Sequence, residues 1–398
     1  MVFNHGIHRI HGTLVSLVLL FGVVVSAVAA EPGITVEARQ RYPWNGLVDL
    51  KFTITGESGT KYDTSFVAKD MVGGTNIAMK TIRKSNGVVA EEKEKLLPGT
   101  YNWVWDAAAD LPKDFKCERM TVTGNAEQSQ GLYMVIDLSS GANSSKYPVS
   151  YLDAVPSGGW GNVYKTTKMV LRWCSKGKDP KGRYTLTKDF YIGVFEVTCK
   201  QYYLVMGAWP RGHGESDASQ PAEYITWNIA RGNNWPSDVS PASNSFSGKL
   251  RSRTGMFVDL PTEAQWEYAC RAGTTSSFNN GGSTEADLKM IGRYIGNCKA
   301  LVDGTYIWCT SVVGSYKANA WGIFDMHGNL WELCLNWHGG NSLTGIDPKG
   351  VSSGIYRVSR GGSFDQAWDC CTSSFRIQGS TGEREYEDGF RMCINLTE

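Results

Sequence analysis

The stretch Asn319–Glu332, with the sequence NAWGIFDMHGNLWE, is the part of this chain that decides its fold. Gly and Trp are frequent in the whole sequence, with 45 and 14 copies, which favours a loop-rich fold pinned by large aromatic side chains. Trp321 and Trp331 are better explained as buried anchors than as a binding surface, because buried aromatic side chains dominate core energetics. The stretch therefore predicts irregular backbone held around tryptophan.

Four further motifs accompany this stretch in a fixed order. They are Asp189–Thr198 (DFYIGVFEVT), Leu260–Gly273 (LPTEAQWEYACRAG), Arg357–Phe364 (RVSRGGSF) and Gly389–Arg391 (GFR). One motif alone is a weak signal, whereas five in order are specific. Together they resemble the formylglycine-generating enzyme, or sulfatase-modifying factor, family.

The resemblance assigns residues 155–398 to a domain of that family. It implies an α+β, C-type-lectin-like fold with few regular elements and a small twisted sheet. Two helices are predicted inside it from capping boxes at Thr198–Gln201 and Thr262–Gln265, with Gly273 ending the second helix. We expect Gly361 and Gly362 to supply backbone torsions that other residues avoid.

Residues 31–150 predict a separate, all-β domain. Apolar and polar residues alternate in 50–55, 103–105 and 120–123, which is typical of half-buried strands. Glycine-rich turns separate these segments, so we expect a small β-sandwich-like accessory domain with a spacing or binding role. A stretch rich in Ser, Gly and Pro, 139–161, is interpreted as the linker.

Residues 1–30 predict a signal peptide. Leu14–Val25 is an apolar run too short to span a membrane comfortably, and Ala27–Ala29 supplies a small-x-small cleavage pattern. The alternative, an uncleaved membrane anchor, is less favoured. The mature protein is therefore expected to be exported to a periplasm, a cell surface or the medium, with no stable membrane span after cleavage.

The charge balance argues against a nucleic-acid partner. Cleavage removes Arg9 from the 40 Lys and Arg residues, which leaves as many cations as the 39 Asp and Glu residues. Phosphate binding needs a basic face, and this chain offers no excess of positive charge. Only His213, His327 and His338 remain after cleavage, and no H-E-x-x-H string occurs, so a zincin-type site is excluded.

All ten cysteines lie in the mature chain, and most are expected to pair in an oxidising compartment. Cys298 and Cys309 are the favoured pair. Cys117 is the only cysteine before residue 160, so a bridge between domains or a free thiol is expected. Vicinal Cys370 and Cys371 could form a strained disulfide, but separate bonds, for example from Cys371 to Cys334, are favoured.

The resemblance also implies a structural calcium site. Its ligands would be the side chains of Asp325 and Glu332 and the backbone carbonyls of Gly328 and Leu330, a set of oxygen atoms that suits Ca²⁺. The alternative is that both carboxylates cap turns or bind arginines. A second calcium site is predicted at Asn297 and Asp303.

Catalysis in the family oxidises a substrate cysteine to formylglycine with O₂ and Cu⁺. The resemblance implies that two cysteines, three and eight residues after the serine of the Gly-Gly-Ser motif, hold the copper. Here the serine is Ser363, and the two positions are Gln366 and Cys371. Trp331 also occupies a family pocket position. An amide is a poor ligand for Cu⁺, so Gln366 argues against the oxidase reaction.

Two functions follow from this sequence. The first is that of an exported member of the family that acts on a protein or peptide with a cysteine motif. The second is that of a non-catalytic binding module for a protein, peptide or glycan on a C-type-lectin-like scaffold, with Trp209, Trp235 and Phe278 in its variable loops. Fold alone does not decide between them.

Overall fold

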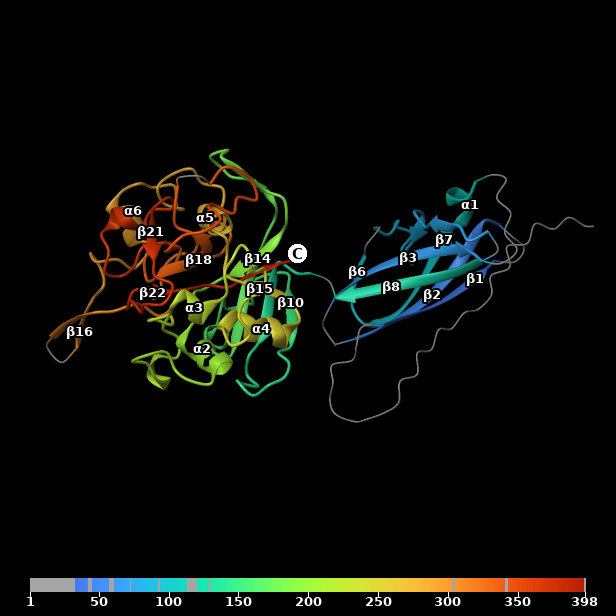
Figure 1. Cartoon of the computed structure of the whole chain (residues 1–398). Coiled ribbons are helices and arrows are strands. Elements are labelled where there is room, and N and C mark those ends of the chain that lie inside the picture. The colour runs from blue at the N-terminus through green and yellow to red at the C-terminus, as the bar shows by residue number, and fades with distance from the viewer. Residues whose placement is uncertain are drawn as a thin grey trace, which may run out of the picture. The chain divides into compact units, whose positions relative to one another are not determined.

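The structure is a computed structural model that describes residues 33–396, except 42–44, 57–60, 72, 92–93, 113–119, 129, 303–304 and 341–342. The chain forms two compact units, 1–130 and 131–398 (Figure 1). The predicted signal peptide and Cys117 lie outside the described residues.

The first unit contains two antiparallel sheets. One sheet has the strand order β1-β2-β7-β5, and the other joins β4, β3 and β6, with β8 also paired to β3. These strands are β1 (Gly33–Gln40), β2 (Leu47–Thr55), β3 (Tyr62–Asp70), β4 (Asn76–Ala78), β5 (Ile82–Arg83), β6 (Glu94–Leu96), β7 (Gly99–Asp106) and β8 (Met120–Gln128). A single helical turn, α1 (Ala107–Asp110), follows β7.

One hydrophobic cluster fills the first unit, with side chains from both sheets. In β2, Leu50, Phe52 and Ile54 are buried, whereas Lys51 between them is exposed. The ring of Phe52 meets Phe66 of the second sheet edge-on, with centroids 4.8 Å apart. The alternation in the sequence therefore marks the face of each strand that packs into the core, as predicted.

The second unit begins earlier than the boundary expected at residue 150. Strands β9 (Tyr133–Asp137) and β10 (Val149–Leu152) pair with each other, and β9 pairs with β11 (Lys168–Cys174) of the second unit. The structure thus divides the chain after Gln130, and residues 131–152 belong with the C-terminal unit. The backbone pairing of β9 decides this boundary, because it joins segments on either side of the Ser-, Gly- and Pro-rich stretch.

Among the described residues, the second unit contains four sheets. The largest has the order β10-β9-β11-β14-β23-β15, and a second has the order β21-β20-β18-β22. The remaining strands are β12 (Gly177–Lys178), β13 (Tyr184–Leu186), β14 (Phe190–Gly193), β15 (Phe257–Asp259), β16 (Lys299–Val302), β17 (Thr305–Trp308), β18 (Trp331–Trp337), β19 (Gly345–Ile346), β20 (Arg357–Arg360), β21 (Arg376–Gly379), β22 (Asp388–Gly389) and β23 (Cys393–Asn395).

Short helices surround these sheets (Figure 1). They are α2 (Cys199–Met206), α3 (Trp227–Ala230), α4 (Phe246–Thr254), α5 (Glu263–Arg271) and α6 (Glu285–Lys289), with 3₁₀ turns at Asn162–Lys165, Glu215–Asp217 and Trp368–Cys371. Both predicted capping boxes are present, at Thr198 and Thr262. Helix α5 ends at Ala272, which takes the left-handed conformation with φ 44°, one residue before the predicted Gly273.

The core of the second unit contains an ion pair that is fully buried. Arg391 forms a two-pronged contact with the carboxylate of Glu332, which also accepts a 2.7 Å hydrogen bond from Trp266 Nε1. Arg391 donates further to the carbonyls of Gly193, at 2.9 Å, and Phe324, at 3.1 Å. The Glu332–Arg391 pair therefore connects four of the five sequence motifs.

A second buried network lies beside it. The carboxylate of Glu267 in α5 accepts hydrogen bonds from Arg360 of β20 and, at 2.7 Å, from Arg271. Arg183 reaches the same carboxylate at 2.6 Å. The arginine cations hold the pKa of Glu267 below its ordinary value, against the opposing effect of burial. These ion pairs inside the core fix the position of α5 against the β18–β20 sheet.

In the part of the chain that the structure describes, no helix is long and apolar enough to cross a membrane.

The buried Glu332–Arg391 pair yields a stability prediction. Replacing Glu332→Gln leaves the Arg391 cation buried without its counter-ion, and we expect this to lower the free energy of unfolding by about 3–5 kcal/mol. Urea unfolding followed by tryptophan fluorescence measures the change. The control is Glu215→Gln, which removes an exposed pair with Lys200 and should cost less than about 1 kcal/mol. Equal, small effects of both substitutions would contradict a structural role for the buried pair.

Candidate functional site

The sequence motifs meet around the β21-β20-β18-β22 sheet. Glu332 of β18 lies opposite Arg360 of β20, and Trp331 lies opposite Asp388 of β22. Gly361 and Gly362 follow β20 with φ values of 99° and 81°, so both occupy conformations that favour glycine, as predicted. This turn carries the chain directly from the sheet into Ser363, the first of the predicted catalytic positions.

Ser363, Gln366 and Glu387 form one hydrogen-bonded group. The hydroxyl of Ser363 donates to Glu387 Oε2, and the amide of Gln366 donates to the same oxygen at 2.9 Å. The backbone of Glu387 is fixed in turn, because its carbonyl accepts from Trp331 N at 2.8 Å. The structure thus brings three of the predicted catalytic positions to one residue, Glu387: Ser363 and Gln366 bind its carboxylate, and Trp331 binds its backbone carbonyl.

Glu387 was not among the residues singled out from the sequence. It lies two residues before the final Gly389–Arg391 motif, and the only available signal was its place beside that motif. Tyr386, its neighbour, donates from its hydroxyl to Asp365 Oδ2. The group therefore links the 363–366 turn to the 386–387 segment at two points.

Cys371 lies under this turn, and its side chain is fully buried. The thiol contacts the carbonyl of Ala367 at 3.6 Å, and a Cβ placed on Gly362 would come within 2.4 Å of the sulfur. Burial raises the pKa of the Cys371 thiol, so the neutral form is favoured. Cys370 is half-buried, and burial raises the pKa of its thiol as well.

These residues do not fit a two-thiolate copper site. The position of the first thiolate holds an amide that is already bound to Glu387, and amides are hard donors with poor affinity for Cu⁺. The remaining thiol, Cys371, is buried, and burial raises its pKa, which disfavours the thiolate that metal binding requires. Copper chemistry therefore has no complete ligand set at this site.

At the first predicted calcium site, too, the side chains have other partners than the family pattern implies. Both carboxylate oxygens of Glu332 are occupied by Arg391 and Trp266, which is the arginine-binding alternative for this side chain. Asp325 is buried, and its Oδ2 accepts from Gly314 N at 2.6 Å, whereas its Oδ1 has no partner. The expected set of Asp325, Gly328, Leu330 and Glu332 therefore does not fit calcium through Glu332.

A third carboxylate, Glu196, lies close to these residues. It accepts from Asn329 Nδ2 at 2.6 Å and from Leu330 N at 3.1 Å. Burial, followed by the charges of Asp325 and Glu332, raises its pKa well above the ordinary value. Within the described ranges, no group of three or more His, Cys, Asp or Glu side chains is arranged to hold a metal ion.

The structure describes only Asn297 of the second predicted calcium site. Asn297 uses its side chain within its own turn: Oδ1 accepts from Tyr294 N at 2.9 Å, and Nδ2 donates to Gly292 O at 3.0 Å. Asp303 lies outside the described residues. This site stays a prediction.

The nine described cysteines are all free thiols, and most of them are buried. The expected Cys298–Cys309 bridge is not formed, although Cys309 Sγ lies 3.9 Å from the carbonyl of Cys298. Instead, Arg293 donates to Cys309 Sγ at 3.4 Å. Neither the Cys370–Cys371 nor the Cys334–Cys371 alternative is formed.

Comparison with known proteins identifies the domain. The profile of the family described as "Sulfatase-modifying factor enzyme 1-like domain" matches residues 155–396, which is more than half of the chain. The chain belongs to this family, and its second unit has the mixed helices and strands of the expected C-type-lectin-like fold.

Among individual proteins, the chaperone protein LppX of Paenibacillus barcinonensis is 28% identical over 51% of this chain and 81% of its own length. The formylglycine-generating enzyme of Thermomonospora curvata is 30% identical over 41% of this chain. The chain spans about half of that enzyme, 52% of its length. A solved structure, Treponema denticola variable protein 1, covers 57% of this chain and 95% of its own with a TM-score of 0.44 and 24% identity.

Asp388, next to Glu387, gives a pH-dependent prediction. Burial, and then the charges of Glu385 and Glu387, raise its pKa from 3.8 to about 7. Since the folded pKa lies above the unfolded one, the ionised form is disfavoured by folding, and this residue costs stability above pH 7. The cost is lost as the pH falls from about 7 towards 4.

We therefore expect Asp388→Asn to be more stable than the wild type at pH 8, by up to about 4 kcal/mol. The advantage should disappear near pH 4, where the wild-type carboxyl is protonated in both states. Urea unfolding at both pH values measures it, with Glu383→Gln, on the exposed segment just before the buried Asp388, as the control. A stability difference that does not change with pH would show that the Asp388 pKa is not raised.

Proposed function

We propose that the family domain of this chain is a non-catalytic module that binds a protein or peptide. The observation that carries this proposal is the Ser363–Gln366–Glu387 group, in which Gln366, at the position of the first copper ligand, is hydrogen-bonded to Glu387. A domain that lacks a copper site keeps the scaffold and the pocket position of the family but has no means of activating O₂ there.

The surface beside this group supports binding of a peptide. Trp368 and Tyr386 are both exposed, by 36% and 39%, and lie in sequence next to Gln366 and Glu387. Exposed aromatic side chains next to a polar group are a frequent feature of recognition surfaces, because they bury large areas at low entropic cost. The similarity to LppX, which is described as a chaperone protein, favours the same class of partner.

The second candidate is oxidation of a substrate cysteine to formylglycine. It is favoured by the position of Trp331, Ser363 and Cys371 around one turn and by the similarity to formylglycine-generating enzymes. This reaction requires a copper site, and Gln366 stands at the position of its first thiolate ligand. A glycan is a further candidate partner, since C-type-lectin-like scaffolds accept different ligands on their loops.

The proposal predicts that the chain binds cysteine-containing peptides without converting their cysteine to formylglycine. The full mature chain should bind peptides from a cysteine-containing peptide array, and the bound cysteines should stay unmodified when Cu⁺ and air are supplied. We expect Trp368→Ala to weaken peptide binding about tenfold, which is typical for an aromatic contact residue. Ile355→Ala is the control, because Ile355 is 78% exposed and lies outside the 363–387 group.

Mass spectrometry of the incubated peptides decides between the two candidates. Copper-dependent formylglycine formation by the wild type would contradict the non-catalytic proposal. Selective binding to a glycan array, with none to peptides, would contradict the proposed partner. A Gln366→Cys variant provides the matched control for the oxidation assay, because it restores a thiol at the first ligand position beside Cys371.

Calcium dependence can be tested separately. Because Arg391 and Trp266 occupy both oxygens of Glu332, we expect the thermal midpoint of the second unit to be the same in Ca²⁺ and in EDTA. Differential scanning fluorimetry measures it. A higher midpoint in Ca²⁺ that is absent in Asp325→Asn would contradict this expectation and support the site suggested by the family pattern.

We further propose that the chain is exported, on the strength of the apolar run 14–25 and the small-residue pattern at 27–29. Mass determination of the mature N-terminus after secretion is the corresponding test.

A further inference from the structure

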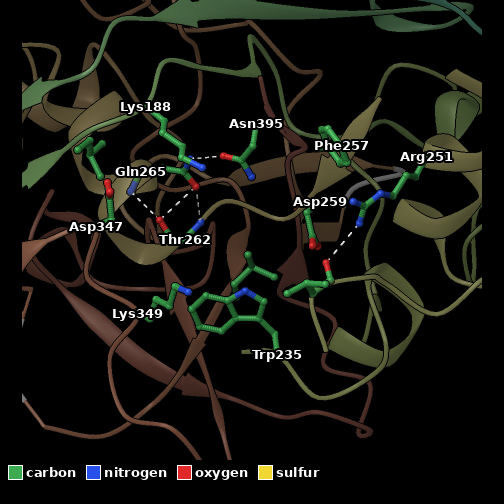
Figure 2. A pocket seen from close by; sticks show the side chains of 13 residues that line it. Lys188, Trp235, Arg251, Phe257, Asp259, Thr262, Gln265, Asp347, Lys349 and Asn395 are labelled. Carbon is green, nitrogen blue, oxygen red and sulfur yellow. Dashed lines mark hydrogen bonds between the residues drawn. The ribbon is translucent and has the colours of Figure 1, made fainter. Parts of the chain in front are cut away.

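A cavity of about 380 Å³ in the second unit is surrounded by the side chains that Figure 2 shows. Its buried polar side chains are bound to neighbours within the protein. Asp259 pairs with Arg231 at 3.2 Å, and Gln265 Nε2 donates to Asn395 Oδ1 at 2.8 Å. These contacts hold the wall of this cavity together, which points to a structural role for its polar groups.

A smaller cavity, of about 270 Å³, has a different wall. It contains three aromatic residues, Trp160, Phe195 and Phe324, together with Val155 and three glycines. Among the described residues that line it, Lys165 is the only charged one. The volume lies just below the range for drug-sized ligands, so a smaller molecule suits it.

The aromatic rings of this cavity come from segments that are distant in sequence. Phe195 follows β14, and Phe324 N donates to Val194 O at 2.9 Å, which holds the two segments together. The rings of Phe195 and Phe324 stack, with centroids 5.1 Å and planes 30° apart. Trp160 meets the ring of Tyr133 edge-on at 4.9 Å. Rings that border a cavity offer stacked and edge-on contacts to a further planar ring.

Glycine keeps the space beside these rings open. Gly314 has a φ of 70°, and a Cβ there would lie 2.5 Å from the Phe195 ring and 3.3 Å from Lys165 Nζ. Gly322 has a φ of 78°, and a Cβ there would lie 3.0 Å from the Tyr133 hydroxyl. The lysine and the rings can therefore approach one another only because these two positions carry no side chain.

Lys165 is half-buried, and its backbone is fixed by a 2.8 Å hydrogen bond from Thr198 Oγ1 to its carbonyl. In the part of the chain that the structure describes, its Nζ forms no hydrogen bond and no ion pair. Instead, Nζ lies 5.4 Å from the centre of the Phe195 ring, a cation–π contact. An ammonium group has three N–H donors, so a ligand with oxygen acceptors can bind here.

The charge of Asp325 also acts on Lys165, although this carboxylate is not part of the cavity wall. Its Oδ2 accepts from Gly314 N at 2.6 Å, and the charge of Arg391 acts on it as well. Burial lowers the pKa of Lys165, and the charge of Asp325 opposes this effect. An anion inside the cavity would contact the ammonium directly and offset the cost of burying it.

We propose that this cavity binds a small aromatic carboxylate. The carboxylate would accept hydrogen bonds from Lys165 Nζ, and the ring would pack against the rings of Phe324 and Trp160. A neutral aromatic ligand would lack the charge-assisted hydrogen bonds, and an aliphatic carboxylate would lack the ring contacts. The inference is independent of the peptide-binding function, because the cavity has no residue in common with the Ser363–Gln366–Glu387 group.

Three ligands of similar size separate charge from ring contacts: benzoate, benzyl alcohol and cyclohexanecarboxylate. Isothermal titration of the full mature chain should show saturable benzoate binding at millimolar concentration, as is typical of so small a ligand. We expect benzyl alcohol to bind about tenfold more weakly, because it has no charge. Cyclohexanecarboxylate should bind about threefold more weakly, because it keeps the charge but has no aromatic ring.

Lys165→Gln tests the charged contact. It should weaken benzoate binding about tenfold and leave the affinity for benzyl alcohol unchanged. Lys317→Gln is the matched control, because Lys317 is exposed and lies three residues after Gly314 without lining the cavity. The control should bind benzoate as the wild type does.

Phe324→Leu tests the ring contact without changing charge. Its apolar side chain keeps most of the volume, and we expect benzoate binding to weaken about threefold while cyclohexanecarboxylate binding stays unchanged. Thermal midpoints show that each variant is folded. The proposal would be overturned by the absence of saturable benzoate binding up to about 10 mM, by equal affinity for either comparison ligand, or by unchanged benzoate affinity in both Lys165→Gln and Phe324→Leu.

Discussion

The arrangement of the second unit depends on the buried pair between Glu332 and Arg391. The carboxylate comes from β18, and the guanidinium comes from the last motif of the chain, far from it in sequence. A buried ion pair is stable only if its remaining hydrogen-bonding groups are satisfied, and here Trp266 and two backbone carbonyls satisfy them. The pair thereby fixes α5, β14 and β18 relative to one another, and it places the turn at Ser363 beside the 386–388 segment.

The same pair also illustrates how residues can stand at the family's metal-binding positions and yet be hydrogen-bonded to other side chains. The sequence keeps Glu332, but its carboxylate accepts hydrogen bonds from Arg391 and Trp266. In a similar way, Gln366 keeps the position of a copper ligand but uses its amide to bind Glu387. In both places the fold has been retained while the ligand atoms are used for internal hydrogen bonds. Membership of the family therefore does not by itself establish its metal chemistry in this chain.

Strand β18 connects distant parts of this unit. Trp331 at its start donates from its backbone N–H to the carbonyl of Glu387, and the carbonyl of Leu335, four residues later, accepts from Arg357. Alternate side chains of a strand point to opposite faces, so residues 331, 333 and 335 share one face and Glu332 faces the other. A single short strand thus binds the 386–388 segment at one end and Arg357 at the other, with the central ion pair between them.

The sequence by itself determined the α+β family fold, the strands of the first unit, both capping boxes and the glycine pair at 361–362. These features depend on residue order and local backbone preference, which a sequence displays directly. The role of Glu387, the division after residue 130, the free thiols and the buried contacts of Arg357 were decided only by the tertiary structure. Each depends on side chains or strands that are distant in sequence and meet only in the folded chain, as Arg357 does with Trp235 and Leu335.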